Sequence, residues 1–175
     1  MNKKITIINS LNQGVYLFNE LISSLNQNDF ETNFNNKWSA GQDLVHLNKI
    51  LQILNIAYVL PKPLLRILYE ANKKESRSFD ELRTLYKAAL AGGAKSPALY
   101  LPKPVLFHAK EDLIKKHQML NQALVNKFNK VSESDLDKYQ LPHPILGKVT
   151  LKELAAFTSF HTVHHFELLK TKLGR

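Results

Sequence analysis

Apolar residues recur at intervals of three and four through most of this 175-residue chain, a spacing that places them on one face of an α-helix. The first such run covers about residues 5–25. The second follows Ser39, which precedes Gln42 by three residues as an N-cap precedes its capping-box partner, and it should continue to Pro61. No segment alternates polar and apolar residues for long enough to build a sheet.

Two further long helices are predicted in the second half of the chain. One should cover about residues 109–128, whose apolar side chains have helical spacing. Residues 141–149 contain two prolines and should form a turn or an extended loop. The last helix begins after Thr150, which forms a capping-box pattern with Glu153, and ends at Gly174.

The segment between the second and third long helices is less regular. It predicts a short helix at about residues 64–69 and another that follows the capping-box pattern of Ser78 with Glu81 and closes at Gly92. Three prolines make residues 96–107 an extended excursion over the surface. We therefore expect an all-α fold, a four-helix bundle with a partly helical insertion between helices two and three.

Composition narrows the class of protein. The apolar content of 44% is sufficient for one core, so we expect a single domain over residues 1–175. The absence of cysteine excludes disulfides, a thiolate nucleophile and cysteine-ligated metal, which leaves histidine, carboxylate and water as ligands. Because there is neither a long uncharged apolar run nor a signal-peptide pattern, we expect a soluble, cytoplasmic protein that does not bind a membrane.

The formal net charge of +9 favours anionic partners in general. The positive residues are scattered, however, and there is neither a Gly-aromatic RNA-binding signature nor a compact basic arm. A solvated basic surface is therefore favoured over a nucleic-acid interface, which is the least supported functional interpretation. Glycine-rich phosphate loops and dinucleotide-binding motifs are also not recognisable in the sequence.

The most informative chemistry lies in the segment His-Thr-Val-His-His at residues 161–165. His161 and His165 are four residues apart in an apolar stripe, offset by about 40° around the helix and about 6 Å along it, so both rings can converge on one ion. Two ligands hold a metal poorly, and His46 in the second helix is the best candidate for a third. Hydrogen-bonded core or rim histidines without metal remain the alternative.

Three neighbouring side chains each allow two interpretations. His164 lies about 100° from His165 around the helix, so it should be at the rim of the site, with proton transfer as the alternative. His143 could cover the site from its proline-bounded loop, but a backbone hydrogen bond is favoured. Asp43 could hydrogen-bond a ligand histidine, although its position in the first helical turn favours a role with the helix dipole.

Three pieces of the sequence together resemble the DinB-like (DinB/YfiT) superfamily. They are Lys37-Trp38-Ser39 followed by His46-Leu47, then His143-Pro144 with Gly147 and Thr150, then His161-Thr162-Val163-His164-His165. The resemblance covers most of the chain and is closest to an uncharacterised branch of that superfamily. It implies a four-helix bundle in which three histidines hold a divalent metal ion near one end.

On this resemblance the metal ligands are His46, His161 and His165, and the ion is zinc or nickel. Related branches include bacillithiol- and mycothiol-dependent transferases, in which the metal activates a thiol cosubstrate, and metal-dependent hydrolases. This chain departs from the common pattern at Val45, where many relatives carry an acidic residue beside the first histidine. An acidic side chain that would hydrogen-bond the first histidine or transfer a proton is therefore not expected at that position.

We therefore expect a metal-dependent enzyme that acts on a small molecule, as a hydrolase or as a transferase with a low-molecular-weight thiol as cosubstrate. The sequence identifies no catalytic residue. The alternative is a noncatalytic metal-binding or ligand-binding bundle, for which a homodimer is expected, in which the ion is structural.

Overall fold

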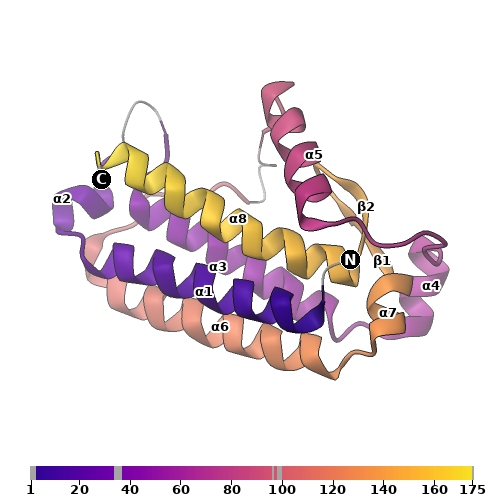
Figure 1. Cartoon of the computed structure of the whole chain (residues 1–175). Helices are drawn as coiled ribbons and strands as arrows, with labels where there is room; N and C mark the ends of the chain where they lie inside the picture. Colours follow the sequence, from indigo (N-terminus) through magenta and orange to yellow (C-terminus); the bar gives the residue numbers. More distant parts are fainter. Residues whose placement is uncertain (1–2, 34–36, 96, 98–99, 175) are drawn as a thin grey trace.

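Four long helices form the body of the molecule. The computed structural model describes residues 3–33, 37–95, 97 and 100–174. The long helices are α1 (Lys4–Ser23), α3 (Ala40–Ala57), α6 (Lys110–Lys130) and α8 (Leu151–Lys172). They run alongside one another in Figure 1, with α1 packed on α6 and α8 and with α3 packed on α6 and α8. The predicted four-helix bundle is confirmed.

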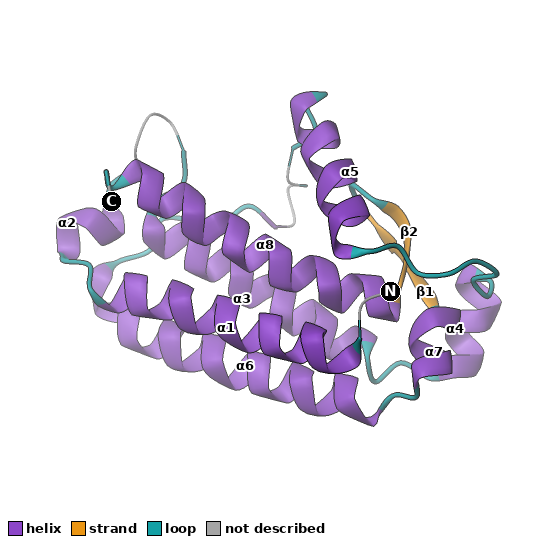
Figure 2. Cartoon of the chain, viewed as in Figure 1, coloured by secondary structure: helices purple, strands orange, loops and turns teal. Residues whose placement is uncertain are grey.

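Shorter elements join these helices (Figure 2). They are α2 (Gln27–Glu31), α4 (Lys62–Tyr69), α5 (Phe79–Ala91), α7 (Glu133–Lys138), β1 (Gln140–His143) and β2 (Gly147–Thr150). Because α4 and α5 lie between α3 and α6 in the chain, the partly helical insertion is also confirmed. Its predicted extended stretch is described only at residues 97 and 100–107, and the remainder of that prediction lies outside the described residues.

The segment expected to be a turn or loop is a small antiparallel hairpin. Gln140 pairs with Thr150 and His143 pairs with Gly147, and a tight turn joins β1 to β2. Gly147 has a φ of +71°, a left-handed conformation that glycine adopts without steric cost. Each strand has only four residues, which is too short for a period of two to be recognised in the sequence.

Local hydrogen bonds of the predicted capping boxes fix the starts of three helices, α3, α5 and α8. Ser39, Ser78 and Thr150 each accept a hydrogen bond from the backbone N–H three residues ahead, and Gln42, Glu81 and Glu153 return one to the cap. All three predicted capping boxes are therefore present. Within the described part of the chain, no single helix is long and apolar enough to cross a membrane; α3 and α4 meet that requirement only together, across a bend of 104°.

The core contains two apolar clusters. The larger one occupies the end of the bundle near the hairpin and includes Phe128 and Leu154. The smaller one lies beneath α2 and includes Phe30 and Leu44. A Cβ atom on Gly41 would lie 2.7 Å from the Phe30 ring, so only glycine permits this close approach. The contact fixes the first turn of α3, which carries residues of the candidate site.

Ion pairs attach the insertion and α7 to the start of α8. Arg77 donates to both carboxylate oxygens of Glu153, at 3.0 and 2.8 Å. The almost fully buried amino group of Lys152 contacts Glu133 and Asp137 at 3.0 and 2.8 Å. A buried cation is stable only when it is paired in this way. These contacts fix the insertion and α7 against the N-terminal end of α8.

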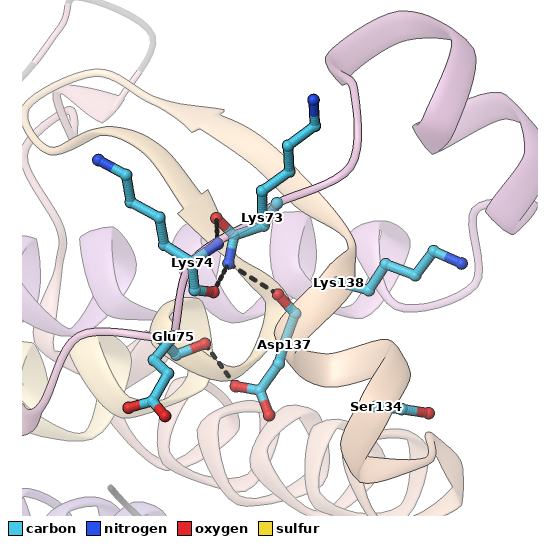
Figure 3. Close-up of a pocket in the computed structure, with 8 residues that line it drawn as sticks. Lys73, Lys74, Glu75, Ser134, Asp137 and Lys138 are labelled. Carbon is cyan, nitrogen blue, oxygen red and sulfur yellow. Dashed lines mark hydrogen bonds between the residues drawn. The ribbon is translucent and has the colours of Figure 1, made fainter.

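A surface pocket of about 460 Å³ opens at the same junction (Figure 3). Asn72 donates hydrogen bonds to the carbonyl oxygens of Lys74 and Asp137, at 2.6 and 3.0 Å. The amino groups of Lys73, Lys74 and Lys138 point in different directions in Figure 3. They do not converge on a common ligand, and the polar groups between them already bond one another.

A buried polar contact links α1 to α6. His117 is fully buried, and its Nδ1 lies 2.8 Å from Oδ1 of Asn19. Burial penalises the charged ring and lowers the pKa of His117 from 6.5 to about 3. The ring is therefore neutral at physiological pH and can donate its Nδ1 proton to Asn19.

Stability should consequently rise with pH between about 3 and 6.5, because the unfolded His117 binds a proton in this interval while the folded one does not. His117→Gln retains an amide donor for Asn19 but cannot titrate. Its free energy of unfolding should depend less steeply on pH than that of the parent, by up to about 1.4 kcal/mol per pH unit. Urea unfolding in chelator at several pH values measures the difference, and parallel curves for the two proteins would contradict it.

Candidate metal centre

Three buried histidines meet between α3 and α8. His46 comes from the second turn of α3, and His161 and His165 come from successive turns of α8. One ring nitrogen from each lies within 4.8 Å of the other two. The structure therefore brings together the three side chains that the sequence singled out.

His165 is oriented by the carboxylate of Asp43. Its Nδ1 lies 2.9 Å from Oδ1 of Asp43, and Nζ of Lys172 donates to the other oxygen at 2.8 Å. Burial raises the pKa of Asp43, but the hydrogen bonds and charges of His165 and Lys172 outweigh it and hold that pKa below its usual value. The ionised carboxylate can only accept, so Nδ1 of His165 donates and its Nε2 is the ring nitrogen left for a ligand.

His46 is oriented by a backbone carbonyl. Its Nδ1 lies 3.2 Å from the oxygen of Tyr100, and because a carbonyl can only accept, Nδ1 carries the proton. Burial and the nearby His165 lower the pKa of His46 to about 4. The ring is thus neutral at physiological pH, and its Nε2 lone pair is available to a ligand.

His161 completes the group from the wall of the bundle. Its ring stacks on Phe157 at 5.4 Å between centroids, and burial, followed by the neighbouring histidines, holds the pKa of His161 well below 6.5. Its Nε2 lies 3.2 Å from Nε2 of His165, while its buried Nδ1 has no partner among the described residues. Two lone pairs this close repel each other unless a proton or a cation lies between them.

This donor set fits a divalent metal ion. Three imidazoles offer nitrogen ligands, the type that zinc, nickel and copper accept. Two of the rings donate their other N–H to a carboxylate and to a carbonyl, which is how metal-binding histidines are commonly oriented. The group could therefore hold a metal with ligand positions left over.

The three histidines open into a cavity of about 690 Å³. Its walls come from α3, α5, α8 and the turn of the hairpin. Most of the lining is apolar, and Tyr86, His143 and His164 add polar groups near the three histidines. The volume is in the range of sites that enclose small molecules.

The sequence matches the DinB superfamily over residues 11–169, a range that includes all three histidines. The chain belongs to the DinB superfamily. No curated protein matches it. The resemblance seen in the sequence is thereby confirmed, and this DinB protein has the buried three-histidine group that the resemblance implied.

In this DinB protein Asp43 has the role that the sequence analysis gave as the less favoured alternative. A helix-dipole role was favoured for it, yet its carboxylate is buried and bonds both His165 and Lys172. A position in the first helical turn is compatible with both roles, so local sequence could not separate them. Lys172 stands seven residues after His165, two turns along the same face, and this spacing was an available signal.

The other side chains near the centre agree with their expected positions. His164 is half-buried and lines the cavity, as expected for a rim residue. Nδ1 of His143 accepts the backbone N–H groups of Ile145 and Leu146 at 3.2 and 3.1 Å, which confirms the favoured backbone hydrogen bond. The His143 ring also lines the cavity. Tyr100 contributes through its backbone carbonyl, for which no side-chain signal exists in the sequence.

Asp43→Asn should weaken zinc binding by about 10- to 100-fold, because the neutral amide no longer stabilises the imidazole N–H and leaves Lys172 without its anionic partner. Competition with a chromophoric chelator measures the affinity. Asp112→Asn is the matched control, since Asp112 is an exposed acid in the first turn of α6. Equal zinc affinity in the two variants would contradict this prediction and would indicate that Asp43 acts only on the helix dipole.

Proposed function

We propose that this protein is a metal-dependent enzyme whose divalent ion, zinc or nickel, is held by His46, His161 and His165. The observation that carries the proposal is the convergence of three buried imidazoles, with one nitrogen of each within 4.8 Å of the others, at the wall of a 690 Å³ cavity. When bound, the ion would supply Lewis acidity, which polarises a carbonyl group and favours the ionised form of a water or thiol beside it.

The chain's own residues have three tasks in this proposal. Asp43 and the Tyr100 carbonyl orient His165 and His46, so that their Nε2 atoms face the centre. Packing of His161 against Phe157 fixes the third ring. The apolar walls exclude water from a substrate, which strengthens electrostatic interactions inside the cavity.

The reaction is of the hydrolase type or of the thiol-dependent transferase type, with a low-molecular-weight thiol as cosubstrate in the second case. Both use Lewis acidity at an ion with open positions, and family membership is compatible with both. The partner in either case is a small molecule, since the site lies inside a cavity rather than on an exposed surface.

A noncatalytic metal-binding or ligand-binding bundle is the second candidate. The observation that favours it is the cavity lining, which among the described residues includes no aspartate or glutamate. Among the described residues no carboxylate therefore faces the cavity as a general base, since that of Asp43 lies behind His165 and outside the lining. Imidazole and phenol groups would have to carry any proton transfer.

Elemental analysis tests the metal site. Protein purified without chelator or nickel resin should contain about one divalent ion per chain, and both His46→Ala and His161→Ala should lose it because each removes a ligand from a three-ligand set. His108→Ala, which changes an exposed histidine outside the cavity, is the control and should retain the ion. A parent protein that binds no ion even after reconstitution would refute the proposal.

A separate assay distinguishes the enzyme from the binding bundle. The metal-loaded protein is tested for ester hydrolysis and for transfer to a small thiol, with the chelated protein and His46→Ala as blanks. Metal-dependent turnover supports the enzyme. A stoichiometric ion with no turnover, no exchangeable ligand position and a large loss of melting temperature on chelation supports the binding bundle.

A further inference from the structure

The cavity beside the three histidines is elongated and is polar at one end. On α3 its lining runs from His46 through Leu54 to Ala57. On α8 it runs in the opposite sequence direction, from Leu168 past His165 to Leu154. From His46 to Ala57 and from His165 to Leu154 there are 11 residue steps, or about 16 Å at 1.5 Å per residue. The channel thus extends about three helical turns beyond the histidines.

Beyond the histidines most of the wall is apolar. Ile53 and Leu54 come from α3, Leu90 from α5, and Leu141 and Ile145 from the hairpin and its turn. A polar molecule along this wall would lose its hydrogen bonds to water without replacement. The body of a ligand that fills the channel must therefore be apolar.

Some of the apolar side chains that line the channel also contact water. Ile53, Ile56 and Leu101 line the cavity and are 38%, 61% and 49% exposed. Apolar surface gains free energy when it is removed from water, and exposed apolar side chains gathered around a cavity are typical of a binding site. An apolar ligand body that lies against these three side chains would cover them.

The charges that surround the channel favour an anionic head group. Lys95 lines the cavity, and no acidic side chain does so among the described residues. The three imidazoles are neutral ligands, so a divalent ion held by them would keep its full positive charge. A carboxylate is a group of opposite charge that such an ion can bind.

We propose that the cavity binds an elongated amphiphile with one anionic head group, a fatty-acid-like molecule, whose head faces His46, His161 and His165 and whose apolar body lies along Ile53, Leu54 and Leu90. The assignment of the head group rests on the proposed function, because it requires the metal ion. The assignment of the apolar body rests on the cavity alone. The amphiphile is the substrate or ligand of the centre, and it is distinct from any thiol cosubstrate.

The test uses acetate, hexanoate and decanoate as probes of the zinc-loaded protein. Trp38, the chain's one tryptophan, lines the cavity with its ring 4.8 Å from that of His46, so its fluorescence reports on the histidine end. Affinity should rise by up to about fourfold for each methylene buried. Equal affinities for hexanoate and decanoate would overturn the inference.

Orientation is tested with decanoate brominated either beside the carboxylate or at the far end of the chain. Bromine quenches a tryptophan that it contacts, so the first acid should quench Trp38 strongly and the second weakly, at similar calorimetric affinities. Stronger quenching by the second acid would overturn the proposed orientation.

Two variants assign the binding to the channel. Ile53→Gln should weaken decanoate binding by about fourfold or more, because it places an amide in the apolar wall. Ile5→Gln makes the same change at a position on α1 that is 60% exposed and outside the cavity, and it should have no effect. Equal effects of the two variants would overturn the assignment.

The two proposals fail in different ways. In His46→Ala without metal, affinity should fall by a similar factor for hexanoate and decanoate, while the gain with chain length remains. If the protein binds the ion but its affinity does not rise with the chain length of the acid, the amphiphile proposal alone is overturned. A gain from chain length in a parent protein that binds no ion would overturn the metal centre and leave the apolar channel in place.

Discussion

The geometry of the candidate centre depends on one buried carboxylate, that of Asp43. It connects the first turn of α3 to the last two turns of α8, through His165 at 2.9 Å and Lys172 at 2.8 Å. Burying a charge costs several kcal/mol unless charged hydrogen bonds compensate for it, and Asp43 has two of them. Removal of either partner would therefore loosen the contact between the helices that carry the three histidines.

That one interaction also determines the chemistry available at the centre. Because the carboxylate accepts the Nδ1 proton of His165, the Nε2 lone pair of this ring faces His46 and His161. Gly41, two residues before Asp43, allows Phe30 to pack against the same turn and fix its position. The apolar cavity then opens on the side of the histidines that the protein leaves free.

Much of the fold could be predicted from the sequence because its signals are local. Helical periodicity and the capping boxes of Ser39, Ser78 and Thr150 identified the helices, and the four-residue spacing of His161 and His165 identified one side of the centre. The hairpin was missed because its strands of four residues are too short to show alternation. The hydrogen bond of Asp43 to a ligand histidine was only the alternative, because its partner His165 is 122 residues away, whereas the favoured helix-dipole explanation needs only its own turn.

X-ray absorption at the zinc edge, on protein reconstituted with one equivalent of zinc, identifies the atoms that bind the ion. We predict imidazole scattering from three nitrogen ligands at roughly 2.0–2.1 Å, the usual zinc–nitrogen distance, and a reduced imidazole contribution in His161→Ala. A spectrum of oxygen ligands without imidazole scattering, unchanged in His161→Ala, would contradict it.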